Sequence, residues 1–127
     1  MVGLDTNVLV RLATNDDPRQ AARARALIRA EGPAFVNRAT MLEFVWVLQY
    51  VYEYAREDIV GAMERLLNVD RVIVEDRLLI ERAAALFGRG ADFADALFAE
   101  SNVEQGCTTT YTFDKPAAKR LAHMTLV

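Results

Sequence analysis

Short apolar runs alternate with longer segments of helical periodicity along the whole chain. Residues 2–4 form the first run, which is too brief for periodicity alone to separate a strand from a helix. Strands are expected at residues 2–4, 34–36, 72–74 and 107–111, with a last edge strand at 124–127. Helices are expected at residues 8–13, 19–30, 39–54, 56–68, 76–87, 92–105 and 116–121. The alternation predicts an α/β fold with three layers (α/β/α) around a central parallel sheet of four or five short strands.

Two of the expected helices have unusual surfaces. The helix at residues 39–54 is apolar almost all round, which predicts burial on several sides, either as a central core helix or against another chain. The helix at residues 19–30 is amphipathic, and its polar face carries Arg19, Arg23, Arg25 and Arg29. An ordinary solvated face explains this arginine stripe, and contact with RNA phosphates is the alternative.

Composition narrows the class of protein. The chain has 127 residues and a hydrophobic fraction of 53%, enough for one domain with a real core. The net charge of −3 argues mildly against broad, charge-driven nucleic-acid binding. One cysteine and one histidine exclude Cys/His zinc chemistry within a single chain, and the lone Cys107 favours a reducing cytoplasm. We expect no signal peptide and no membrane span, because no apolar run approaches the roughly 20 residues required.

Acidic residues recur where strands end or helices begin. Asp5 follows the first expected strand, and Glu43 lies early in the helix after the second. The remaining acids flank the fourth strand: Asp92, Asp95 and Asp114. In a parallel sheet these positions share one edge, so the carboxylates are expected to converge.

Helix capping is the competing explanation for each of these acids. Asp5, Asp92 and Asp114 each have the position of an N-cap, and Asp95 that of a partner for the helix dipole. Thr40 and Glu43 have the spacing of a capping box. Capping, however, gives no reason for so many acidic caps at one edge of the sheet.

Converging carboxylates would require a cation, because they raise one another's pKa. Mg²⁺ or Mn²⁺ suits ligation by oxygen alone. Such an ion polarises a phosphate and activates a water molecule. The lone His123 leaves no Ser/His/Asp or Cys/His arrangement to compete. The residues therefore point to phosphodiester hydrolysis without a covalent enzyme intermediate.

Four blocks in order resemble the PIN-domain ribonucleases, and most of all the VapC-like toxins of prokaryotic toxin–antitoxin pairs. The blocks are Leu-Asp-Thr-Asn-Val-Leu at residues 4–9, Glu43, Ala-Asp-Phe-Ala-Asp-Ala-Leu-Phe-Ala at 91–99 and Thr-Phe-Asp at 112–114. The resemblance covers essentially the whole chain and implies a single PIN domain over residues 1–127. It implies a metal-dependent ribonuclease whose catalytic and metal-binding acids are Asp5, Glu43, Asp95 and Asp114. Supporting roles fall to Asn7, Asp92 and Thr112.

The resemblance also implies partners. Toxins of this kind form homodimers and bind a cognate antitoxin, whose C-terminal segment wraps over the toxin. The apolar helix at residues 39–54 suits such a groove, and the candidate contacts on it are Trp46, Tyr50 and Tyr54. The substrate would be RNA, recognised at exposed single-stranded or loop nucleotides.

Three other functions fit the sequence less well. A phosphatase with an aspartyl nucleophile normally has a second Asp two residues after the first, where this chain has Asn7. A receiver-type signalling domain would match Glu75, Asp76 and Lys115 in part, but it gives Glu43 no role. A PIN scaffold that only binds partners would not need all four acids.

Overall fold

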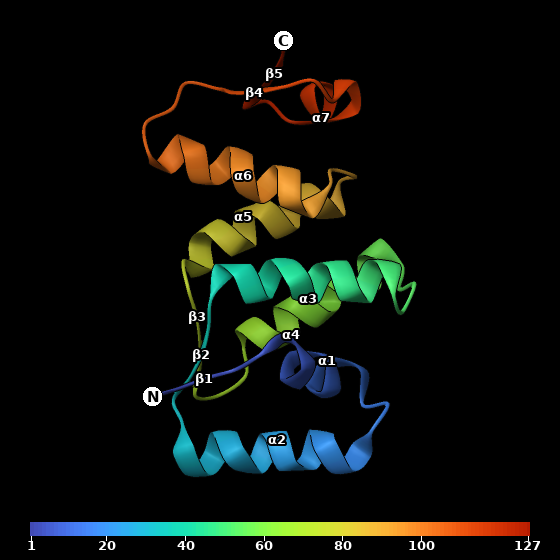
Figure 1. Ribbon diagram of the computed structural model, residues 1–127, viewed down its shortest axis with the longest axis vertical. Coiled ribbons are helices and arrows are strands. Elements are labelled where there is room, and N and C mark those ends of the chain that lie inside the picture. The colour runs from blue at the N-terminus through green and yellow to red at the C-terminus, as the bar shows by residue number, and fades with distance from the viewer. The chain divides into compact units, whose positions relative to one another are not determined.

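Seven helices and five short strands make up the chain in a computed structural model that describes residues 1–127 (Figure 1). The contacts between elements divide the chain into two compact units, Met1–Asp76 and Arg77–Val127, called unit 1 and unit 2 below. All strand pairs in both units are parallel, as the alternating pattern predicts. No helix is both long enough and apolar enough to cross a membrane.

Unit 1 has a three-stranded parallel sheet in the order β1-β2-β3. Its elements are β1 (Val2–Gly3), α1 (Thr6–Thr14), α2 (Pro18–Glu31), β2 (Ala34–Val36), α3 (Arg38–Tyr50), α4 (Arg56–Leu67) and β3 (Val72–Val74). In the register of the sheet, Val2 pairs with Ala34 and Phe35 with Ile73. Because β1 and β2 are parallel, α1 and α3 begin at the same edge of the sheet.

The core of unit 1 forms around α1, which contacts α2, α3 and α4 (Figure 1). Each helix contributes its apolar positions to this core. The largest fully buried side chains here are Leu9, Val36, Met41, Phe44, Val45, Leu48, Ile59 and Met63. This packing fixes α1, and with it the end of β1 where Asp5 lies.

Unit 2 consists of a helix pair followed by a two-stranded parallel sheet. Its elements are α5 (Arg77–Gly88), α6 (Phe93–Glu104), β4 (Thr110–Thr112), α7 (Lys115–Arg120) and β5 (Met124–Leu126). Helices α5 and α6 pack through Phe87 and Phe93, whose ring centroids are 6.1 Å apart. On their surface Arg82 forms ion pairs with Glu100 and Glu104. Helix α7 connects β4 to β5.

Two predicted boundaries are wrong. The helix expected to reach residue 54 ends at Tyr50, because the following turn brings the Tyr52 hydroxyl to Asp16, to which it donates at 2.8 Å. The strand expected at residues 107–111 is Thr110–Thr112 instead. Its expected start belongs to the turn after α6, where the Cys107 N–H donates to the Asn102 carbonyl at 3.0 Å.

Helix α3 is also less buried than its composition predicts. Met41, Phe44, Val45 and Leu48 form its buried face, whereas 55% of Trp46 and 57% of Tyr50 are exposed. A helix that is apolar all round is therefore buried on one side here, with large aromatic side chains on the other.

Candidate functional site

Asp5 lies at the carboxyl end of β1 and caps α1. Its Oδ1 accepts a hydrogen bond from the Thr6 N–H at 2.7 Å, and the residue is exposed. This confirms the capping interpretation of Asp5, although the helix begins at Thr6, two residues earlier than expected. One carboxylate oxygen of Asp5 thus fixes the helix start, and the other is left for a ligand.

Glu43 does not form the expected capping box. The N-cap of α3 is Asn37, whose Oδ1 accepts from the Thr40 N–H at 2.7 Å. Because α3 begins before Thr40, Glu43 is the sixth residue after the cap and lies too far along the helix to bond back to it. Its side chain is exposed and has no intramolecular hydrogen bond or ion pair, so capping does not explain an acid at this position.

Two acids of unit 2 are N-caps, as the capping interpretation predicts. Asp92 caps α6, and its Oδ2 accepts from the Asp95 N–H at 3.0 Å. Asp114 caps α7, and its Oδ1 accepts from the Ala117 N–H at 3.0 Å. Thr112 orients the second cap, because its hydroxyl oxygen accepts from the Asp114 N–H at 3.0 Å.

Asp95 differs from the other acids in its electrostatics. It lies half-buried in the first turn of α6. Burial raises the pKa of the Asp95 carboxyl, and the negative charges of Asp92 and Asp114 raise it further. Unit 2 therefore brings these three acids close enough to interact, and it disfavours the charged form of the most buried one.

The predicted acids thus fall into two sets. Asp5 and Glu43 belong to unit 1, where Asp5 caps α1 and Glu43 lies in α3, two helices that begin at the same edge of the sheet. Asp92, Asp95 and Asp114 belong to unit 2. The structure gathers no group of three or more acidic, histidine or cysteine side chains that could hold a metal ion. All of the candidate ligands are carboxylates, the donor set that suits Mg²⁺ or Mn²⁺.

The PIN domain family matches residues 2–123 of the chain. This chain belongs to the PIN domain family. The search of curated proteins returned no match.

Membership of the PIN family confirms the predicted fold class, a three-layer α/β/α fold with a parallel sheet, here built from few and short strands. PIN domains are generally nucleases that use divalent metal ions. The family match therefore argues against the alternative of a receiver-type signalling domain.

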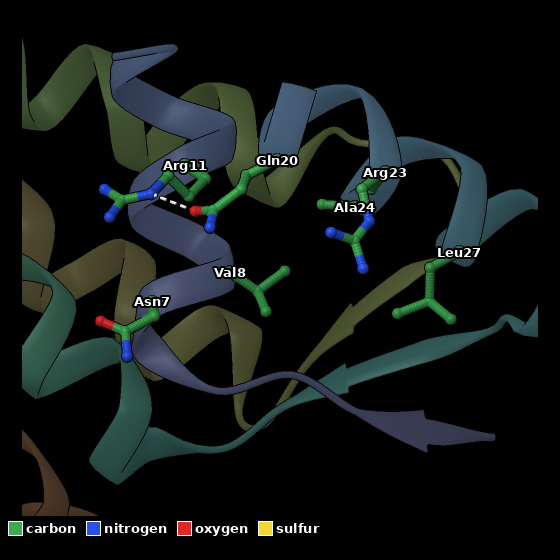
Figure 2. Close-up of a pocket in the computed structure, with 7 residues that line it drawn as sticks. All are labelled: Asn7, Val8, Arg11, Gln20, Arg23, Ala24 and Leu27. Carbon is green, nitrogen blue, oxygen red and sulfur yellow. Dashed lines mark hydrogen bonds between the residues drawn. The ribbon is translucent and has the colours of Figure 1, made fainter. Parts of the chain in front are cut away.

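The arginine stripe of this PIN domain does not form one face. Arg23 lines a cavity of about 440 Å³ between α1 and α2 (Figure 2), whose lining residues are Asn7, Val8, Arg11, Gln20, Arg23, Ala24 and Leu27. Arg25 lines a smaller, mainly aliphatic cavity of about 230 Å³ among α1, α2, α3 and α4. Arg19 and Arg29 are exposed and line neither cavity.

The cavity between α1 and α2, called the α1–α2 cavity below, was not found from sequence. Periodicity assigns Leu27 to the buried face of α2, but 42% of this side chain is exposed where it lines the cavity. Gln20, Arg23 and Leu27 have the helical spacing of one face. The sequence therefore shows that these side chains share one face of α2, but it does not show that a cavity lies next to that face.

The aromatic side chains expected to contact partners differ in exposure. Trp46 and Tyr50 form an exposed pair one helical turn apart, with ring centroids separated by 5.5 Å. Tyr54 follows the end of α3 and packs edge-on against Tyr52, at a centroid distance of 6.0 Å. The exposed pair is thus the better candidate for a contact with another chain.

Proposed function

We propose that this PIN domain is a metal-dependent endoribonuclease and the toxin of a toxin–antitoxin pair. The observation that carries the proposal is the PIN family match over residues 2–123, together with an acid at all four positions that the family resemblance requires. A scaffold that only binds partners would gain nothing from the electrostatic cost of keeping Asp95 near two other acids.

In this proposal the residues that bind Mg²⁺ or Mn²⁺ are Asp5, Glu43, Asp95 and Asp114. Asp92, Asn7 and Thr112 support them. Asp5 and Asp114 each use one oxygen to cap a helix, so packing of α1 and α7 fixes the direction of the carboxylates. Glu43 has no competing bond. Charge repulsion around Asp95 is the property that a bound cation would relieve.

The reaction would add water across a phosphodiester bond of RNA. A bound divalent ion would polarise the phosphate and lower the pKa of the attacking water. The water oxygen would form a bond to phosphorus while one P–O ester bond breaks, leaving one phosphate end and one hydroxyl end. The protein contributes the fixed carboxylates and forms no covalent bond to the RNA.

The proposed partners are a second copy of the chain and a cognate antitoxin. The exposed Trp46–Tyr50 pair supports a contact with a protein partner, because aromatic side chains are enriched at interfaces. A cytoplasmic location is part of the same proposal and fits an exposed cysteine that has no disulfide, Cys107.

Cleavage of total RNA tests the proposed activity. Purified protein free of antitoxin is incubated with Mg²⁺, Mn²⁺ or EDTA, beside the variants Asp5→Asn and Asp17→Asn. Asp17 is the matched control, since it caps α2 through the Gln20 N–H at 3.1 Å but has no place among the proposed ligands. Discrete metal-dependent fragments that Asp5→Asn loses and Asp17→Asn retains would support the proposal.

Two results would overturn the proposed activity. One is cleavage by Asp5→Asn at the wild-type rate with the same metal dependence. The other is a folded wild-type protein that cleaves no RNA and that, by calorimetry, binds Mn²⁺ no more tightly than Asp5→Asn does.

A further inference from the structure

The residues that line the α1–α2 cavity include a close sequence neighbour of Asp5, one of the proposed metal ligands. Asn7 is one of its lining residues and follows Asp5 by two positions on α1. The cavity is formed entirely within unit 1, by the two helices that meet at the loop after Thr14. Asn7, the second residue of α1, thus brings one edge of the cavity to the end of α1 that Asp5 caps.

The two arginines of the cavity have different partners. Arg11 is engaged: its Nε donates to the Gln20 side-chain oxygen at 2.7 Å, and it also bonds to Asp16 and Tyr52. Arg23 is exposed and forms no ion pair or hydrogen bond within the protein. Figure 2 shows its guanidinium extending from α2 into the space beside Val8. No acidic side chain lines the cavity, so its free charge is positive and suits an anionic group.

The remaining lining suits a flat, partly apolar body. Val8, Ala24 and Leu27 form an aliphatic wall, and 42% of Leu27 is exposed to solvent. The side-chain amides of Asn7 and Gln20 add hydrogen-bonding groups at its edge. At about 440 Å³ the cavity has the size of small-molecule sites. A lone phosphate would leave the aliphatic wall uncovered, whereas a nucleotide provides both an anion and an unstacked base.

We propose that the α1–α2 cavity binds one nucleotide of single-stranded RNA that neighbours the cleaved phosphate. Arg23 contacts the phosphate of this nucleotide, and the aliphatic wall with Leu27 receives its base. The inference rests on the proposed ribonuclease function and adds a substrate subsite to it. It favours single-stranded RNA, because paired bases in a duplex are stacked and cannot enter a cavity.

Binding of RNA without metal tests the subsite separately from cleavage. The probe is a short, fluorescein-labelled single-stranded RNA of random sequence, and the protein is Asp5→Asn, which keeps the probe uncut. Arg23→Gln is added to this background, with Arg65→Gln as the control. Arg65 lies on α4 in the same unit, is exposed and lines the smaller aliphatic cavity instead. Thermal unfolding of each variant confirms that it folds.

Arg23→Gln is expected to weaken RNA binding about tenfold, as the loss of a charge-assisted hydrogen bond does. The slope of log affinity against log salt should fall by about 0.7, the value for one phosphate contact of a single strand. Leu27→Ala should weaken binding without changing that slope. Arg65→Gln should change neither quantity by a comparable amount.

Several outcomes would overturn the subsite. These are no RNA binding by the Asp5→Asn protein, equal losses in Arg23→Gln and Arg65→Gln, or equal affinity for duplex RNA. A co-expressed polypeptide that Arg23→Gln releases, with RNA affinity unchanged, would assign the cavity to a protein partner instead. In the cleaving enzyme, Arg23→Gln should raise KM and leave kcat unchanged. Cleavage with an unchanged KM would refute the subsite while leaving the ribonuclease proposal standing.

Discussion

Replacing Asp92 by Asn and by Ala separates its two roles, as the cap of α6 and as a negative charge beside Asp95. Both substitutions remove the charge that helps to raise the pKa of Asp95. Only Ala removes the oxygen that accepts from the Asp95 N–H at 3.0 Å. The difference in stability between the two variants therefore isolates the cap.

The expected size of that difference follows from known helix caps. Asn is as good an N-cap as Asp, and replacement by Ala costs about 1 kcal/mol. For two-state unfolding of a chain of 127 residues, the entropy of unfolding converts this loss to a fall of about 4 °C in Tm. Asp92→Asn should match or slightly exceed the wild-type Tm, because the cap remains while the repulsion at Asp95 is reduced.

The Tm of both variants is measured by thermal unfolding at neutral pH, monitored by far-UV circular dichroism. The same pair of substitutions at Asp17, which caps α2, is the control for a cap whose acidic neighbour, Asp16, is already paired with Arg11. There Ala should again be less stable than Asn, but Asn should bring no gain over the wild type. Equal Tm values for Asp92→Asn and Asp92→Ala would refute the assignment of Asp92 as a cap.

Three further predictions follow from the same contacts. Asp95→Asn should raise the Tm at neutral pH, because a raised pKa means that the folded protein disfavours the charged carboxylate. The gain in Tm should be absent below the ordinary aspartate pKa and should grow as the pH rises from there through the raised pKa of Asp95. A gain in Tm that is independent of pH would contradict this reasoning. Tyr52→Phe should lower the Tm at neutral pH, since the hydrogen bond from the Tyr52 hydroxyl is the main cause of the lowered pKa of Asp16. Thermal unfolding measured across pH should show that the part of this fall in Tm that is due to Asp16 disappears as the pH falls through the lowered pKa of Asp16. Glu43→Gln should abolish RNA cleavage and change the free energy of unfolding by less than about 0.5 kcal/mol, because Glu43 is exposed and unbonded; urea denaturation and the cleavage assay together check this.

The sequence by itself determined the order of strands and helices, the parallel α/β class and the PIN family. These depend on local information: apolar periodicity sets the type of an element, and the blocks around Asp5, Asp95 and Asp114 lie within a few residues of an element boundary. It also identified Asp92 and Asp114 as caps, since a cap needs only the helix that follows it.

Only the tertiary structure decided how those elements use their side chains. Helix α3 ends at Tyr50 because Tyr52 bonds to Asp16, a residue far away in the sequence. Glu43 is not a capping residue because α3 begins after Asn37. Arg23 and Arg25 line different cavities, because one cavity is formed by α1 and α2 alone and the other also borders α3 and α4. Periodicity places a residue on a face of its own helix, but the packing of neighbouring helices determines whether that face meets a core, a cavity or solvent.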